Sequence, residues 1–242
     1  IDINRQFRSA VIIGLPDFVR HFLDGLPPEK RPLNIEIYDD WPNGFHEGIA
    51  PDLIVSGLVL QSVNEIPWVI KQAKDNLEPD GLFLSCLLGG ESLLGLKRAC
   101  FGADQKKYGG IIPRVSPMID VQQASGLIQS AGFALPVIDR DACRVKYKSL
   151  KTLIEDLRDI GETNILSAYT PRYAGRQFLE EITENYLERD GRGKYSVLLD
   201  ILWMTGWAPH ESQQKPLKPG SAKMRLADAL GAVEKKLPPQ TD

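Results

Sequence analysis

The sequence lacks the residue patterns that mark several common classes of functional site. Its three cysteines and three histidines are scattered over 242 residues without a CxxC pair or a Cys/His cluster, a spacing that argues against a structural zinc site. It also contains no Walker-type phosphate loop and no Ser/His/Asp or Cys/His arrangement typical of hydrolases. The formal net charge is only −3, which indicates no basic face for nucleic acid. We therefore expect no metal, no nucleic acid, and a protein or small-molecule partner.

The chain also lacks a long apolar run. No stretch reaches the length of a transmembrane helix, and the N-terminus has no signal-peptide pattern, so we expect no transmembrane segment. The odd number of widely spaced cysteines favours reduced thiols in a cytosolic type of compartment. Because the chain begins at Ile1 rather than Met, an upstream segment that carries a targeting signal stays an open alternative.

Glycine is scarce at the one turn where a nucleotide-binding α/β domain needs several. Residues 10–14 have the apolar pattern of a buried strand and residues 17–26 that of a helix, but the turn between them holds only Gly14. Pro16 cannot donate a backbone N–H, and Phe18 adds bulk where a cofactor must come close to the backbone. This turn therefore argues against ordinary cofactor binding.

Strand and helix patterns alternate along most of the chain. The expected strands cover residues 10–14, 33–38, 52–60, 82–88, 133–139 and 197–204, and the expected helices cover residues 17–26, 66–77, 121–130, 150–160 and 178–187. Several of these strands are apolar on both faces, as in a parallel sheet covered by helices. The pattern predicts an α/β fold with a doubly wound, mostly parallel sheet. Asp200 interrupts the last apolar strand, either at an edge position or as an internally satisfied polar group.

Several motifs after residue 50 resemble those of class I S-adenosylmethionine-dependent methyltransferases. Residues 51–67 and 77–83 are similar to the fourth- and fifth-strand motifs of that family. Other motifs resemble one subgroup of this family in particular, and they lie at residues 89–93, 114–117, 131–133, 156–164 and 205–214. It comprises the methyltransferase-type assembly factors of respiratory complex I, to which arginine hydroxylation is ascribed, and their bacterial relatives. The malonyl-carrier-protein methyltransferases of biotin synthesis are more distant. The resemblance covers roughly residues 50–230.

The resemblance implies a Rossmann-like fold in a single domain over residues 1–242. Within it, residues 150–192 would form a helical insertion before the last strand that covers the substrate side, and residues 209–242 an extended C-terminal tail. The family places two strands and a helix between the first strand and the motif at residue 52, whereas this chain has room there for one strand.

The resemblance also implies S-adenosylmethionine as cofactor, bound at the carboxyl ends of the strands. Five residues are candidates for contacting it: Gly14, Asp39, Ser56, Leu58 and Gln61. Gly14 would stand for the first glycine of the family's loop. Asp39 would stand for a carboxylate that contacts the ribose or the adenine, and its alternative role is a turn cap. The alternative for the residues after position 55 is plain sheet core, which suits Leu58 better than Gln61, whose amide needs a partner if it is buried.

Three residues are candidates for contacting a substrate or partner. Arg114 and Ser116 lie in a loop near the expected substrate side, where the alternative for Arg114 is a structural salt bridge. Tyr147 flanks the helical insertion together with Arg158 and Asn164, and these side chains either face a substrate or cap helices. No catalytic residue is assigned, because an activated cofactor asks little acid–base chemistry of the protein.

Two functions stay open on the sequence alone. One is an S-adenosylmethionine-dependent enzyme of the methyltransferase-like family that modifies a protein side chain in respiratory complex assembly. The other is a non-catalytic assembly or scaffold protein whose cofactor loop is degenerate. A protein partner, a respiratory-complex subunit by resemblance, is expected under both. The expected location is the cytoplasm in a bacterium, and the mitochondrial matrix or the periphery of the inner membrane in a eukaryote.

Overall fold

The computed structural model describes residues 5–42, 50–164 and 175–214 of the chain. Two compact units are distinguished, Ile1–His210 and Glu211–Asp242. All the elements below lie in the first unit, which is described by itself. Most of the expected C-terminal tail, from residue 215 onward, lies outside the described residues, so the predicted domain boundaries stay predictions.

A six-stranded mixed sheet forms the centre of the first unit. Its strands are β1 (Ser9–Ile13), β2 (Asn34–Tyr38), β3 (Leu53–Gly57), β4 (Leu82–Leu88), β5 (Ala134–Tyr147) and β6 (Tyr195–Trp207), in the spatial order β2-β1-β3-β4-β6-β5. Strands β2, β1, β3 and β4 are parallel, whereas β6 is antiparallel to both of its neighbours. The sheet is therefore mostly parallel, as predicted. Among the described residues between β1 and β3 in the chain, β2 is the one strand.

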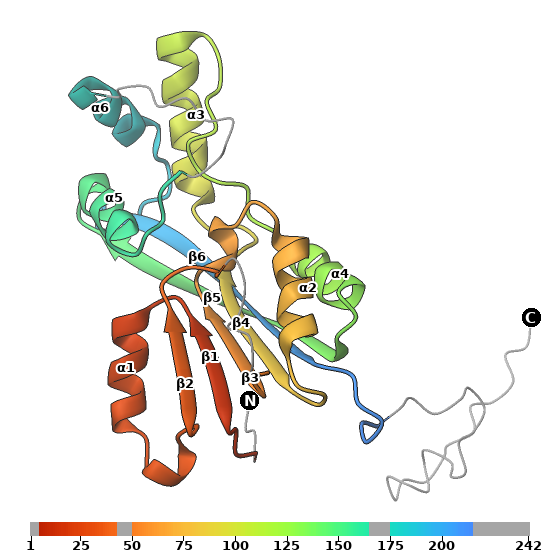
Figure 1. Cartoon of the computed structure of the whole chain (residues 1–242). Coiled ribbons are helices and arrows are strands. Elements are labelled where there is room, and N and C mark those ends of the chain that lie inside the picture. Colours follow the sequence, from red (N-terminus) through yellow and green to blue (C-terminus); the bar gives the residue numbers. More distant parts are fainter. Residues whose placement is uncertain (1–4, 43–49, 165–174, 215–242) are drawn as a thin grey trace, which may run out of the picture. The chain divides into compact units, whose positions relative to one another are not determined.

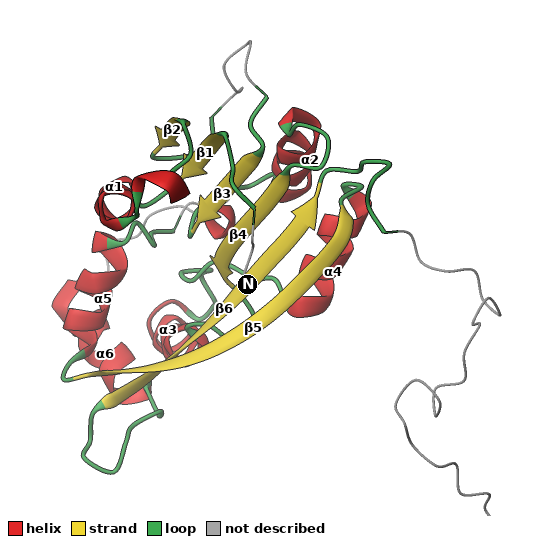
Figure 2. Ribbon diagram, turned by 90° about the horizontal axis from the view of Figure 1, so that it is seen from below, coloured by secondary structure: helices red, strands yellow, loops and turns green. Residues whose placement is uncertain are grey.

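Helices lie on both faces of the sheet, which confirms the doubly wound arrangement. They are α1 (Pro16–Gly25), α2 (Ile66–Asn76), α3 (Leu94–Tyr108), α4 (Val121–Ser130), α5 (Leu150–Asp159) and α6 (Gly175–Asn185), with short 3₁₀ helices η1 (Pro28–Lys30) and η2 (Leu60–Ser62). Figures 1 and 2 show α2 and α4 on one face and α1 on the other. None of the helices within the described ranges is long and apolar enough to cross a membrane.

Two separate apolar clusters stabilise this unit. The first lies between the sheet and the pair α2 and α4, with Ile13, Ile54, Ile70, Phe83 and Ile128 almost completely buried in it. Burial of such side chains contributes roughly 1.5–3 kcal/mol each. The second cluster packs α3, α5 and α6 against the start of β6, at Tyr195 and Val197. Figure 1 shows these three helices around the end of the long ribbon formed by β5 and β6.

The ribbon is longer than the sequence pattern predicts. The strand expected over residues 133–139 continues to Tyr147, and the strand expected over residues 197–204 runs from Tyr195 to Trp207. The extra residues of β5 are mostly exposed and half of them are charged, so they carry no apolar alternation. They are held by pairing with β6 over their whole length. The helices α5 and α6 lie between these two strands in the chain, as the predicted insertion requires.

Two further elements differ from the sequence prediction. The strand expected over residues 52–60 ends at Gly57, because Leu58 adopts a left-handed conformation (φ 52°) and η2 follows. Helix α3 was not predicted, since its apolar residues form no clear stripe and it contains two glycines. It ends at Gly109, whose φ of 67° is the usual left-handed helix stop.

Asp200 is internally satisfied and does not lie at an edge, because β6 runs between β4 and β5. The side chain is buried and accepts hydrogen bonds from the Arg140 Nε (2.7 Å) and the Glu91 backbone N–H (3.2 Å). Its own backbone N–H donates to the Ser92 hydroxyl at 2.7 Å. These bonds join β6, β5 and the turn after β4.

We predict that Asp200→Asn lowers the free energy of unfolding by about 1–3 kcal/mol. Both partners of the Asp200 carboxylate are N–H donors, so the NH₂ group of an asparagine would face one of them. Urea denaturation measures the change. Arg140→Gln is the comparison variant, and we expect a smaller loss from it because glutamine keeps a hydrogen-bond donor for the Asp200 carboxylate. Equal losses in the two variants would contradict this account.

Candidate functional site

The first candidate site is a cavity of about 1030 Å³ at the carboxyl ends of β1, β2 and β3. Ligands of open α/β sheets bind at this edge. The cavity is lined by the turn after β1, the loop after β2, the loop after β3, the start of α2 and the turn after α5. Three of the five predicted cofactor residues line it: Gly14, Asp39 and Leu58.

Gly14 is required by the fold itself. Its φ is 88°, and its N–H donates to the Tyr38 carbonyl at 2.8 Å. A Cβ at this position would overlap the carbonyl oxygen of Gly57 and the Val59 side chain. The turn after β1 and the loop after β3 therefore touch through bare backbone, which only glycine allows here. This contact accounts for the glycine without reference to a ligand.

The turn after Gly14 is short. Leu15 adopts a left-handed conformation (φ 50°) as the N-cap of α1, and Pro16 is the first residue of the helix. At that position the missing N–H of proline is no loss, because it would have no partner within the helix. A leucine with positive φ costs roughly 1–3 kcal/mol, and such strain often accompanies a functional loop. Leu58, on the opposite side of the cavity, is strained in the same way (φ 52°).

The acidic side of the cavity is formed by Asp39 and Asp40, which follow β2 and are both exposed. Neither carboxylate has a hydrogen bond or ion pair with the part of the chain that the structure describes. Trp41 and Trp68 lie in the same lining. The cavity thus offers two free carboxylates beside apolar and aromatic surface. Sequence reasoning found Asp39 and Asp40 but did not connect either tryptophan with this site.

Ser56 and Gln61 are not brought to this cavity. Ser56 is fully buried on the face that Ile54 shares, opposite Ser85 of β4, and neither hydroxyl has a hydrogen-bond partner among the described residues. Gln61 is also buried, and its Nε2 donates to the Leu58 carbonyl at 2.8 Å and to the Glu162 carboxylate. The predicted need of Gln61 for a partner is confirmed, and the partner lies in the helical insertion.

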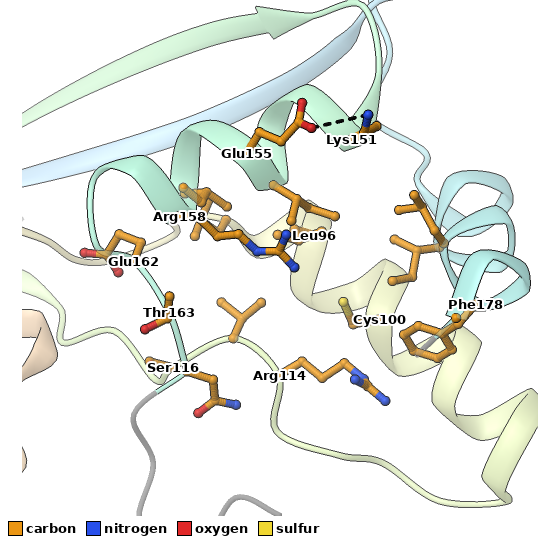
Figure 3. Close-up of a pocket in the computed structure, with 18 of the residues that line it drawn as sticks. Leu96, Cys100, Arg114, Ser116, Lys151, Glu155, Arg158, Glu162, Thr163 and Phe178 are labelled. Carbon is orange, nitrogen blue, oxygen red and sulfur yellow. Dashed lines mark ion pairs between the residues drawn. The ribbon is translucent and has the colours of Figure 1, made fainter. Parts of the chain in front are cut away.

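The second candidate site is a cavity of about 780 Å³ bounded by α3, α5, α6 and residues 114–118. Figure 3 shows its mixed lining, with Leu96, Cys100 and Phe178 beside charged groups. Arg114 and Ser116 line it, as predicted for substrate or partner residues, whereas Tyr147 does not. Tyr147 packs against the second apolar cluster, where burial and its hydrogen bond with Asp156 raise its pKa.

Arg114 is held in a buried salt bridge. Its Nε and Nη2 bind both carboxylate oxygens of Asp104 at 2.8–3.0 Å, and Asp104 is completely buried. The guanidinium also lies 4.2 Å from the ring centroid of Phe178, a cation–π contact. The structural alternative for Arg114 is therefore present, and its charge is balanced within the protein.

The other titratable groups of this cavity differ in their surroundings. Burial raises the pKa of the Cys100 thiol to about 12, so this cysteine is not a nucleophile at neutral pH. Desolvation raises the pKa of Glu162 above its ordinary value of 4.5, and the hydrogen bond from Gln61 opposes that shift. Asn164 donates to the Pro113 carbonyl and Arg158 lines the cavity. Sequence reasoning missed Glu162, although its place directly after Gly161 at the end of a helix was a signal.

The described residues contain no group of three or more His, Cys, Asp or Glu side chains that could hold a metal ion. The chemistry of the two cavities is therefore argued from carboxylates, amides, guanidinium groups and apolar surface.

Comparison with known proteins identifies relatives in sequence. No family model matches the chain. It is 32% identical over 182 residues to "Arginine-hydroxylase NDUFAF5, mitochondrial" of Dictyostelium discoideum, covering 74% of this chain and 42% of that protein. The human protein of the same name is 32% identical over 195 residues (78% and 54%). A malonyl-(acyl-carrier protein) O-methyltransferase of Xylella fastidiosa is 31% identical over 159 residues (65% and 52%). The chain spans about half the length of the curated relatives it matches.

Solved structures share the fold. A methyltransferase candidate from Bacillus halodurans superimposes with a TM-score of 0.52 at 12% identity, covering 86% of this chain and 95% of that one. The YcgJ protein of Bacillus subtilis gives 0.50 at 9% identity, covering 86% and 94%. At such identities the likeness concerns the fold alone, and it confirms the class I methyltransferase-like, Rossmann-like architecture.

We predict that Arg114→Met lowers the free energy of unfolding by about 3–5 kcal/mol, because it leaves the Asp104 charge buried without a partner. Chemical denaturation measures the loss. In the double variant Asp104→Leu/Arg114→Met no charge is left unpaired, and we expect a smaller loss than in the single variant. A single variant as stable as the wild type would show that Arg114 has no structural role.

We predict that Glu162→Gln raises the melting temperature at pH 7, because it removes a desolvated carboxylate and keeps an acceptor for Gln61. The raised pKa means that the folded protein holds this proton to higher pH than the unfolded chain does. The destabilisation by the charge is therefore full above the raised pKa and disappears below pH 4.5, where both states are protonated. Calorimetry at pH 7 and pH 4 tests this, and a difference that does not shrink at pH 4 would contradict it.

Proposed function

Because the chain belongs to the methyltransferase-like family that its relatives define, we propose that it binds S-adenosylmethionine in the first cavity. We further propose that it modifies an arginine side chain of a protein during assembly of a respiratory complex. The choice of arginine follows the name of the relatives, arginine-hydroxylase. The choice of a respiratory complex follows the subgroup that the motifs of this chain resemble. The relatives include proteins named hydroxylase and methyltransferase, so the proposal names the side chain and leaves the reaction type open.

The observation that carries the proposal is the chemistry of the first cavity. Its position at the carboxyl ends of β1, β2 and β3 is the ligand-binding edge of such sheets. The free carboxylates of Asp39 and Asp40 suit the hydroxyl groups of a ribose, which donate hydrogen bonds to carboxylates. Leu58, Val59 and Trp68 provide apolar surface for an adenine ring. A volume of about 1030 Å³ suffices for a ligand of this size.

The chain's own residues would hold and orient this ligand. When bound, S-adenosylmethionine supplies an activated methyl group through its sulfonium. The protein then contributes alignment of cofactor and substrate and exclusion of water. The second cavity is our candidate for the substrate side, since Arg114 and Ser116 line it and the segment from Ile160 to Asn164 borders both cavities. Tyr147, the third candidate for a substrate or partner contact, does not line this cavity.

The proposed partner is a protein, namely a subunit of a respiratory complex. The proposed location follows from the relatives, which carry the word mitochondrial in their names. In a eukaryote the chain would act in the mitochondrial matrix or at the periphery of the inner membrane, and in a bacterium in the cytoplasm.

A specific observation favours a second candidate, a non-catalytic assembly or scaffold protein. The turn after β1 has one glycine, and Leu15 adds a side chain to the cavity wall where a glycine-rich loop would leave bare backbone. The fold and the second cavity do not require a ligand in the first. Cofactor binding therefore discriminates between the two candidates.

We predict that wild-type protein binds S-adenosylmethionine and its demethylated product S-adenosylhomocysteine, with quenching of tryptophan fluorescence because Trp41 and Trp68 line the cavity. Asp39→Asn should weaken binding roughly tenfold, the effect of about 1.4 kcal/mol from a lost hydrogen bond to a charge. Asp24→Asn, on the exposed surface of α1, is the matched control and should bind like wild type. Absence of binding at millimolar ligand would exclude the first candidate and leave the scaffold.

A further inference from the structure

Glu162 is the one acidic residue of the second cavity whose charge is not balanced by a cation among the residues that the structure describes. Glu155 pairs with Lys151 at 3.4 Å, as the dashed line in Figure 3 shows, and Asp104 behind the wall pairs with Arg114 at 2.8 Å. The only partner of the Glu162 carboxylate in the described structure is the Gln61 amide. An amide satisfies one lone pair and leaves the charge in place.

The Glu162 side chain is also only partly exposed to water, which adds to the cost of leaving its charge without a cation. Burial raises the pKa of this group even though a hydrogen bond opposes the shift. A carboxylate taken out of water is destabilising unless a cation and hydrogen bonds compensate. Such uncompensated groups are concentrated at functional sites, where the ligand supplies the missing charge. Among the described residues, the Glu162 carboxylate therefore lacks a cation that compensates its charge.

Arg158 carries the opposite charge in the same cavity, but its side chain is more exposed to water than that of Glu162. Figure 3 shows its guanidinium directed into the cavity from α5. Its side chain is exposed, so water solvates the charge and its lack of an anionic partner in the described part of the chain costs little. An anionic ligand would gain less from the solvated Arg158 than a cationic ligand gains from the desolvated Glu162. This difference favours a cation.

The position of Glu162 connects the second cavity to the first. Ile160 and Gly161 line the first cavity, and Glu162 and Thr163 line the second. The Gln61 amide binds both the Leu58 carbonyl, at the rim of the first cavity, and the Glu162 carboxylate. A group bound by Glu162 would therefore lie at the wall that the two cavities share.

We propose that Glu162 receives the guanidinium group of an arginine side chain in the second cavity, and that Gln61 is a positioning residue that fixes this carboxylate at the wall shared with the first cavity. The inference rests on the proposed function, since it names the residue that recognises the proposed arginine. A planar guanidinium matches a carboxylate better than an ammonium does. The apolar lining, including Leu96, Leu157 and Phe178, suits the methylene stem of arginine.

The test compares a charged probe with its neutral isostere. N-acetyl-L-arginine methylamide and the corresponding citrulline compound are titrated into wild-type protein, Glu162→Gln and Glu155→Gln by calorimetry. We expect the arginine probe to bind wild type and Glu155→Gln alike, and to bind Glu162→Gln at least about tenfold more weakly, as expected for loss of a charge-assisted bidentate contact. The citrulline probe should bind all three weakly. Gln61→Met should weaken arginine binding by less than Glu162→Gln does.

The wild-type protein provides a second measurement that needs no variant. Arginine binding should weaken as the pH falls through the raised pKa of Glu162. We do not expect the same pH dependence from the other titratable groups of the cavity. They are arginines, a lysine, a glutamate paired with that lysine (Glu155) and a thiol that ionises far above neutrality. In Glu162→Gln this pH dependence should disappear. A merely structural role for Glu162 would not change it.

Three results would overturn the inference. The first is equal affinity of Glu162→Gln and wild type for the arginine probe. The second is binding of the citrulline probe as tight as that of the arginine probe. The third is that N-acetylglycinate displaces the arginine probe from the wild type but not from Arg158→Gln. The last result would mean that the cavity takes an anion at Arg158. Failure here is separable from failure of the proposed function, because S-adenosylhomocysteine binding is measured independently in the first cavity.

Discussion

The contact between Gly14 and Gly57 is the constraint on which both cavities depend. It brings the turn after β1 against the loop after β3 without an intervening side chain, and so sets the floor of the first cavity. Leu15 and Leu58, the residues that directly follow these two glycines, both adopt left-handed conformations. Leu58 then presents its carbonyl to Gln61, which in turn binds Glu162. Leu58 and Gln61 thus connect the backbone contact of the two glycines with Glu162 at the wall of the second cavity.

The sheet and most of its helices could be predicted because their residues carry a strong apolar pattern. The limits of β4 (Leu82–Leu88) and α4 (Val121–Ser130) agree with the sequence pattern residue by residue. In β4 the strand is buried on both faces, and in α4 Asp120 and Gln123 form a capping box that marks the start. Prediction failed where pairing or backbone strain decides the structure. The outer half of β5 is mostly exposed and pairs with β6 over its whole length. Leu58 ends β3 through a backbone conformation that its side chain does not reveal.

The candidate site was predicted less completely than the fold, for a related reason. Gly14, Asp39 and Leu58 are near strand ends, so the topology of a parallel sheet brings them to one edge. Ser56 belongs to the same segment, but the alternation of a strand turns it into the core with Ile54. The sequence leaves Arg114 open between a substrate contact and a structural salt bridge, because its partner Asp104 lies on α3, a helix that the pattern does not predict. Gln61 and Glu162 are separated by a hundred residues in the chain, and no local pattern connects them.

The electrostatics of the second cavity bear on the choice between enzyme and scaffold. A protein that only provides a docking surface gains nothing from a desolvated carboxylate without a cation, because a glutamine at position 162 would keep the hydrogen bond and remove the charge. The structure nevertheless places this carboxylate at the wall between two cavities and fixes it with Gln61. Burial of this carboxylate raises its pKa, and a cationic ligand would offset the cost of keeping it charged. The degenerate turn at Gly14 weakens the case for tight cofactor binding, but the second cavity retains a group whose cost a ligand would offset. Under the proposal, the second cavity would recognise its ligand through Glu162 even though the turn after β1 holds a single glycine.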